Sequence, residues 1–303
     1  MSSLAALFAN NLIPVLLIAG VGYLLARWQK LEPRTLSQVC FYVFNPCLIF
    51  TLISQSRLET SAILRITAIA VLATFILGFL AWLAGRLFRL SRRTLVAVLL
   101  TTMFINAGNF GLPVVRFAFG EEALSYGTLF YITSSVLAYS VGVVIASMGE
   151  ASFSRALMNL ARVPTIYGLA FGFLFLGMGW SLPTPLERSV TTLAGASIPA
   201  MLVLLGRQFP QMSLSGQAVP LAITNLTRLV VSPALVAGLS ILFGLTGPAL
   251  QASVLQSAMP SAVLNTVLAT EFDVEPSFVT TAVFTSTLLS PLTLTPLMAY
   301  LGG

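Results

Sequence analysis

The feature that most constrains this chain is a series of long apolar segments that recurs from one end to the other. Each segment has about 20 mostly apolar residues, the length that an α-helix needs to cross roughly 30 Å of hydrocarbon. The segments leave no space for a soluble domain, and only 8% of the 303 residues are charged. The sequence therefore predicts an all-α integral membrane protein in a lipid bilayer.

Hydropathy and turn residues divide the chain into ten predicted spans. They cover residues 4–26, 36–54, 62–85, 94–117, 123–147, 163–180, 186–206, 220–244, 248–270 and 277–301. The first span is longer than a signal-peptide core and no small-residue cleavage site follows it, so we expect it to be retained.

The basic residues alternate between the two sides of these spans. Ten of them fall on one side: Arg27, Lys30, Arg34, Arg86, Arg89, Arg92, Arg93, Arg155, Arg162 and Arg207. Three fall on the other: Arg57, Arg116 and Arg188. Because basic loops face the cytoplasm, we expect a multi-pass protein of the plasma membrane, the inner membrane in a bacterium, with both termini outside. Orientation explains the net charge of +6 better than nucleic-acid binding does.

An internal repeat is visible around four prolines. FNPCLIF around Pro46 resembles SIPAMLV around Pro199 at an offset of 153, and Pro113 and Pro260 are offset by 147. Two units of five spans, residues 1–150 and 151–303, fit both offsets. Because five is odd, the second unit enters the membrane inverted, as in many secondary transporters. The alternative is compositional, since prolines are common in membrane helices.

Two predicted spans carry polar and helix-breaking residues near their middle. These segments are INAGNFGLPVV (residues 105–115) and QSAMPSAVLNTV (residues 256–267). Proline removes a backbone donor and clashes with the carbonyl four residues earlier, and each unsatisfied group in hydrocarbon costs several kcal/mol. We predict two discontinuous helices that cross at the midplane and direct half-helix N-termini into a cavity, where an anion is the expected ligand.

The candidate substrate-binding residues lie in these segments and beside Pro46. They are Asn45, Asn106, Asn109, Pro113, Pro260, Ser261 and Asn265. Asn106 and Asn109 are three residues apart, so both amides share one helix face if the first half-helix continues that far. An amide can bind a carboxylate or fill a freed backbone valence, so each residue has a binding and a structural interpretation. For Asn45 the structural interpretation, satisfying the kink at Pro46, is favoured.

The coupling mechanism stays open at this point. No predicted span has Asp, Glu or His at its centre, which disfavours a side-chain proton relay but leaves a proton carried on the substrate. A candidate sodium site consists of Thr101, Thr102, Asn106 and Ser261. Uniport of an anion driven by the membrane potential, at about 2.3 kcal/mol per charge per 100 mV, fits equally well. We expect no cofactor.

Charged and thiol side chains near the spans receive structural interpretations. Arg228 would lie about 13 Å deep if its span began near Val219, where it could face the cavity, but snorkelling to the cytoplasmic surface is favoured. Snorkelling is also expected for Arg65. The cysteines at positions 40 and 47 lie about 10 Å apart along one helix face and should not bridge. With no His and no Cys/His cluster, we expect no metal.

Three stretches resemble the auxin efflux carrier family, which includes plant auxin exporters and bacterial malate or malonate permeases. They are GVGYLLARWQKLEPRTLSQVCFYVFNPCLIF, NAGNFGLPVVRFAFG and AMPSAVLNTVLATEFDVEPSFVTTAVF. The resemblance implies a scaffold and a transport bundle like those of sodium/proton antiporters or bile-acid transporters, a crossing at Pro113 and Pro260 with the substrate carboxylate nearby, and a homodimer. Asn106 matches the Asn that begins the plant motif. The long cytoplasmic loop of the plant exporters is missing, and Asn265 stands where they tend to have a second proline, so auxin itself stays open.

These observations favour a secondary transporter that moves a small organic anion, such as malate, malonate or an auxin-like acid, by alternating access. An enzyme is not expected, because the chain has no His, no intramembrane carboxylate and no G-x-S-x-G element. The remaining alternative is a non-transporting membrane sensor or scaffold.

Overall fold

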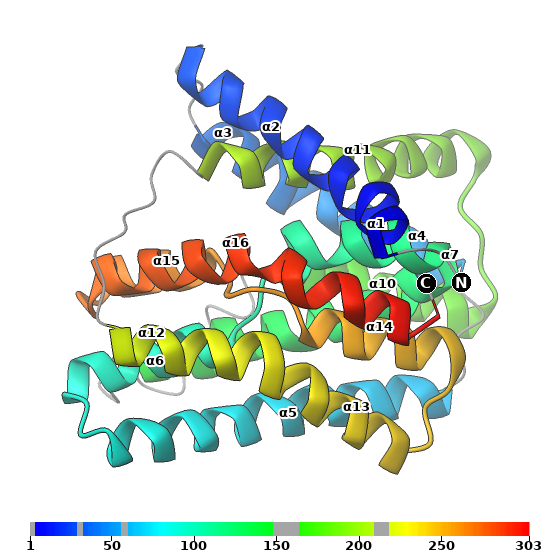
Figure 1. Cartoon of the computed structure of the whole chain (residues 1–303). Coiled ribbons are helices and arrows are strands. Elements are labelled where there is room, and N and C mark those ends of the chain that lie inside the picture. Colours follow the sequence, from blue (N-terminus) through cyan, green and yellow to red (C-terminus); the bar gives the residue numbers. More distant parts are fainter. Residues whose placement is uncertain (1–3, 29–32, 56–59, 148–163, 209–217, 303) are drawn as a thin grey trace.

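The structure is a computed structural model that describes residues 4–28, 33–55, 60–147, 164–208 and 218–302. Those residues are almost entirely helical (Figure 1) and form no sheet; their single β-bridge joins Ile105 and Ser261. Among them, seven helices are long and apolar enough to cross a membrane. The prediction of an all-α membrane protein is confirmed.

The helices of the first half have the following bounds, where η denotes a π-helical turn. They are α1 (Leu4–Leu7), η1 (Phe8–Leu12), α2 (Ile13–Trp28), α3 (Pro33–Val39), η2 (Cys40–Phe44), α4 (Asn45–Ser54), α5 (Thr60–Leu87), α6 (Arg92–Met103), η3 (Ala107–Gly111), α7 (Leu112–Leu137), η4 (Ala138–Gly142) and α8 (Val143–Ala146).

The second half begins with α10 (Pro164–Met178) and α11 (Thr184–Gln208). It continues with α12 (Ala218–Leu226), η6 (Thr227–Val231), α13 (Ser232–Leu242), α14 (Gly247–Ser257), α15 (Leu264–Glu271) and α16 (Pro276–Tyr300). Each predicted span thus contains helix, and the spans 94–117 and 248–270 are interrupted at residues 104–106 and 258–263. Fewer than ten of the described helices are long enough to count as membrane spans, because α10, α6 and α14 have only 15, 12 and 11 residues. In addition, α7 joins two predicted spans in one helix.

Gly120 divides α7 into its two parts. Its φ of 79° and ψ of −169° interrupt the helical backbone, a conformation that is essentially restricted to glycine. A Cβ at this position would meet no atom within 4 Å, so backbone conformation and not space requires the glycine. The kink falls between the predicted spans 94–117 and 123–147.

Most π-helical turns precede a proline. Four of the five described turns, η1, η2, η3 and η6, end two residues before Pro14, Pro46, Pro113 and Pro233 respectively. A proline ring clashes with the carbonyl four residues earlier in an α-helix, and a wider turn relieves that clash. These helices therefore accommodate proline by a local widening and continue beyond it.

Glycines allow two helix pairs to pack very closely. A Cβ on Gly22 of α2 would lie 1.9 Å from the carbonyl oxygen of Val203, and one on Gly206 of α11 would lie 1.6 Å from that of Ala19. Helix α10 approaches α4 in the same way, where a Cβ on Gly168 would lie 2.5 Å from a carbonyl oxygen. Small residues at such contacts are typical of helix packing in membranes.

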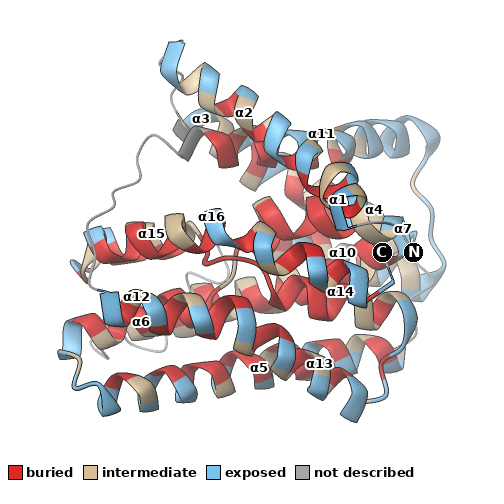
Figure 2. Cartoon of the chain, viewed as in Figure 1, coloured by how far each residue is buried: buried red, intermediate tan, exposed pale blue. Residues whose placement is uncertain are grey.

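Apolar side chains also cover much of the outside. Exposed positions follow the outward faces of α2, α5 and α13 (Figure 2), and they include large apolar residues such as Leu17, Phe79 and Ile241. An apolar exterior around a packed interior is what a hydrocarbon environment requires. Both cysteines are unpaired, as expected.

Candidate functional site

The two interrupted helices meet at the bridge between Ile105 and Ser261. The backbone N–H of Asn106 donates to the carbonyl oxygen of Pro260 over 2.8 Å, and the N–H of Ala262 donates to that of Phe104 over 3.0 Å. The two bonds pair four backbone groups where α6 and α14 end. The two polar segments of the sequence therefore lie against each other.

The position of the crossing differs from the prediction in the first of the two interrupted helices. Pro260 lies at the crossing, but Pro113 lies in the first turn of α7, eight residues beyond Ile105. The expected crossing at Pro113 is wrong because the π-helical turn η3 accommodates this proline without breaking the helix. The break occurs instead where Phe104 takes an extended conformation and pairs with the second segment.

A cavity of about 490 Å³ lies beside the crossing. Three asparagines, Asn45, Asn106 and Asn109, contribute to its wall together with the aromatic side chains Phe41, Tyr42, Tyr131 and Tyr139. No Asp, Glu, Lys or Arg is among the described residues that line it. The described part of its wall is therefore polar and aromatic and carries no side-chain charge.

Two helix N-termini open onto this cavity. Gly108 and Asn109, in the first turn of η3, line it, and so do Val263 and Leu264 where α15 begins. The first N–H groups of a helix have no intrahelical acceptor and carry a partial positive charge. Such ends favour a bound anion.

Asn106 adds an unused hydrogen-bond donor. Its side chain is 6% exposed, and its Nδ2 has no partner among the described residues. An unpaired buried amide is costly unless a ligand or water satisfies it. A carboxylate oxygen in the cavity would be a suitable acceptor.

The other predicted site residues divide into two groups. Asn45 lines the cavity, and its Oδ1 accepts a 2.6 Å hydrogen bond from Ser197 Oγ of α11, a partner that its interpretation at the Pro46 kink did not include. Ser261 and Asn265 do not line it: Ser261 Oγ donates to Thr101 O over 2.6 Å, and Asn265 Nδ2 donates to Phe104 O over 3.1 Å. Pro113 and Pro260 are also outside its wall.

The four candidate cation ligands do not surround one space. Thr101 Oγ1 donates to Ala97 O over 2.9 Å, and Thr102 Oγ1 donates to Val98 O over 2.7 Å. Both threonines are fully buried and lie outside the cavity that Asn106 lines. Their hydroxyl groups are thus satisfied by carbonyl groups of α6 itself.

Arg228 does not snorkel, and the expectation that it reaches the surface is wrong. Its side chain is 1% exposed and donates to the carbonyl oxygens of Thr102 and Ser257, the latter over 2.7 Å, and to Ser232 Oγ. Those carbonyls belong to the last turns of α6 and α14. The burial is explained by the carbonyl groups at the ends of the two interrupted helices and by the hydroxyl group of Ser232 in α13. Arg65 is exposed and donates to Gly244 O over 3.2 Å.

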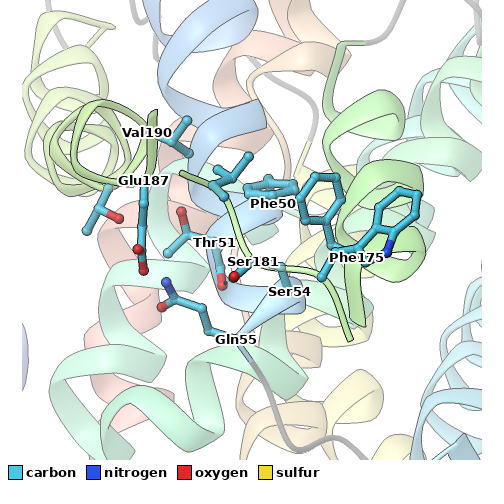
Figure 3. Close-up of a pocket in the computed structure, with 11 residues that line it drawn as sticks. Phe50, Thr51, Ser54, Gln55, Phe175, Ser181, Glu187 and Val190 are labelled. Atoms are coloured by element: carbon cyan, nitrogen blue, oxygen red, sulfur yellow. Dashed lines mark hydrogen bonds between the residues drawn. The ribbon is translucent and has the colours of Figure 1, made fainter. Parts of the chain in front are cut away.

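A smaller pocket of about 120 Å³ lies between α4, α10 and α11 (Figure 3). Phe50 and Phe175 meet edge to face at 5.2 Å on one side, and the carboxylate of Glu187 lies on another. None of the predicted site residues lies in it.

Comparison with known proteins decides the family. The family described as "Membrane transport protein" matches residues 7–154 and 148–298, nearly the whole chain. The chain belongs to this family.

Relatives of this membrane transport protein occur in archaea and plants. An uncharacterized transporter of Methanothermobacter thermautotrophicus is 28% identical over 93% of this chain and 94% of its own length. A second uncharacterized transporter, from Methanocaldococcus jannaschii, is 25% identical over 91% of this chain and 93% of its own length. Auxin efflux carrier component 8 of Arabidopsis thaliana is 21% identical over 92% of this chain and 93% of its own length. The resemblance to auxin efflux carriers is confirmed, and the protein is a multi-pass membrane transporter of that family rather than an enzyme.

Proposed function

We propose that this protein is a secondary transporter that moves a small organic anion, a carboxylate such as malate, malonate or an auxin-like acid, by alternating access. One observation carries the proposal: two helix N-termini and the unpaired Nδ2 of Asn106 lie at a cavity whose described lining residues carry no charge. An anion at a helix N-terminus gains about 0.3–1 kcal/mol at an exposed site and up to about 2 kcal/mol when partly buried. Dipoles and amides can thus hold a carboxylate that must later be released.

The size and the aromatic wall of the cavity support a small organic acid. Ligand pockets commonly enclose roughly 300–1,000 Å³, and the volume of about 490 Å³ lies within that range. Tyr131 and Tyr139 offer flat apolar faces and hydroxyl groups to a carbon skeleton.

We also propose that the chain forms ten spans in two inverted five-span units, residues 1–150 and 151–303. Support comes from helix pairing: α2 packs on α11 and α10 packs on α4, which would be spans one with seven and six with two. In a repeat of five spans, span one corresponds to span six and span two to span seven, so the repeat converts one of these contacts into the other. The two hydrogen bonds at the crossing are reciprocal, and Asn45 and Ser197 join the two similar proline segments.

The position of the cavity supports alternating access. Its wall combines Asn45 of α4, Thr165 of α10 and Leu204 of α11 with residues of the crossing. Movement of the α4–α10–α11 group against the crossed helices would change the side on which the cavity opens. We propose that this protein lies in the plasma membrane with both termini outside, and that it forms a homodimer as the family resemblance implies.

The test is binding followed by flux. Purified protein is screened for a rise in melting temperature with organic anions, because a ligand that binds only the folded state must raise its apparent stability. An anion that stabilises the protein is then followed into proteoliposomes as a radiolabelled compound. Saturable binding and flux are expected for at least one carboxylate, whereas equal flux through protein-free liposomes would refute the proposal.

A further inference from the structure

Arg228 is a buried cation without a carboxylate partner among the described residues. The two ion pairs in the described part of the chain, Arg93–Asp273 and Arg116–Glu121, involve other residues. An isolated charge away from water is strongly unfavourable unless other groups compensate for it. The guanidinium also keeps its positive charge throughout the physiological pH range. Its neighbours must therefore supply negative potential.

The compensating groups are the C-terminal ends of two half-helices. Thr102 and Ser257, whose carbonyl oxygens accept from Arg228, lie in the last turns of α6 and α14. Each helix C-terminus carries about −0.5 elementary charge, so two such ends offset about one positive charge. Ser232 completes the cluster, because its Oγ accepts from Arg228 and donates to Ser257 O over 2.8 Å.

Half-helix C-termini within the membrane are also places where secondary transporters coordinate a cation. Here the remaining space beside the guanidinium is about 10 Å³, which is at most one water molecule. No room is left for a second cation with its own ligands. Ile105 and Ser134 line both this space and the large cavity, so the fixed charge lies one wall away from the proposed anion site.

We infer that Arg228 is the resident cation of the crossing: it supplies permanently the positive charge that a bound sodium ion would supply, and it makes anion binding and transport independent of sodium. Arg228 is thus a positioning residue that holds the ends of α6 and α14 together. The sodium independence of transport rests on the proposed function, whereas the role of the charge in holding the crossing does not.

The first test needs no substrate. Melting temperature is measured at constant ionic strength in sodium chloride and in choline chloride. Wild-type protein should melt at the same temperature in both salts. Arg228→Ser should melt several degrees lower in choline, and sodium should restore part of that loss in a saturable manner, because the vacated oxygens of Thr102 and Ser257 can then coordinate the ion. The melting temperature of Arg228→Lys in choline should lie between those of the wild-type and Arg228→Ser proteins, since lysine keeps the charge with fewer hydrogen-bond donors.

Arg65→Ser is the matched control, because Arg65 is exposed and donates to a single carbonyl oxygen. It should change the melting temperature little and show no response to sodium. A saturable, sodium-specific stabilisation of the wild-type protein would overturn the inference, even if the Arg228→Ser protein cannot be purified. So would an Arg228→Ser protein as stable as wild type.

The second test separates this inference from the proposed function. Flux of an identified anion into proteoliposomes is compared with and without sodium on both sides. Equal flux is expected. Flux that requires sodium would overturn the inference and leave anion transport standing. If no anion is bound at all, the proposed function fails while the melting experiments still decide the role of Arg228.

Discussion

The backbone N–H of Asn106 donates to the carbonyl oxygen of Pro260 over 2.8 Å, and the two residues lie 154 positions apart in the chain. The bond fixes the backbone of Asn106 at the crossing and leaves its side-chain Nδ2 unpaired beside the large cavity. One residue thus joins the two interrupted helices and carries an unpaired side-chain donor in the wall of the cavity.

Replacing this donor should weaken anion binding. Hydrogen bonds to charged groups contribute about 1.5–3 kcal/mol, so Asn106→Ala should raise the Kd of the transported anion roughly tenfold or more. Asn106→Asp should bind more weakly still, because its carboxylate repels the ligand. Isothermal titration of the purified variants measures both effects. Asn10→Ala, the same change at an exposed position, should bind like wild type. Unchanged affinity in Asn106→Ala would remove this residue from the site.

The glycine contact between α2 and α11 should be intolerant of any side chain. In Gly206→Ala, the new Cβ would lie 1.6 Å from the carbonyl oxygen of Ala19, so the two helices must separate. We expect a loss of stability of at least about 1–3 kcal/mol, comparable to overpacking a core. Thermal unfolding in detergent measures it.

Gly20→Ala is the control on α2, since a Cβ there would meet no atom within 4 Å. It should be neutral or stabilising, within about 1 kcal/mol, because alanine favours a helix over glycine. Equal losses in the two variants would contradict the close approach of α2 and α11.

The link between Ser197 and Asn45 should stabilise the packing of α11 on α4. Both side chains are buried and their oxygens are 2.6 Å apart. Ser197→Ala should lower the free energy of unfolding by about 0.5–1.5 kcal/mol, the usual net contribution of such a bond. Ser189→Ala, which removes an exposed hydroxyl from the same helix, should have a smaller effect. Denaturant titration compares the two, and the reverse order would refute the structural role of the bond.

The kink in α7 should depend on the backbone freedom of Gly120. Gly120→Ala forces a Cβ into a conformation with φ of 79°, which costs about 1–3 kcal/mol even though the surrounding space is empty. Gly238→Ala in α13, also in empty space but inside a helix, should cost nothing measurable. Melting temperatures of the two proteins should therefore differ by several degrees, and matching values would show that the kink tolerates other residues.

Much of the architecture followed from local patterns. Long apolar segments can satisfy their backbone in lipid only as helices, so their positions were readable from hydropathy alone. The polar interruptions around Asn106 and Pro260 were readable for the same reason, since such residues are too costly to face lipid. Prolines were less informative, because Pro113 is accommodated by a π-helical turn whereas Pro260 lies at a true break.

The sequence by itself therefore determined the class of the protein, its helices, the two polar interruptions and its family. Only the tertiary structure decided which of these segments contact one another and which groups they pair. The position of the first break depends on pairing between Phe104 and Ala262, far apart in the chain. The burial of Arg228 depends on carbonyl groups from two other helices that end beside it. Hydropathy is a sum over the residues of one segment, so it contains no information on hydrogen-bond acceptors that distant segments place beside a charged side chain.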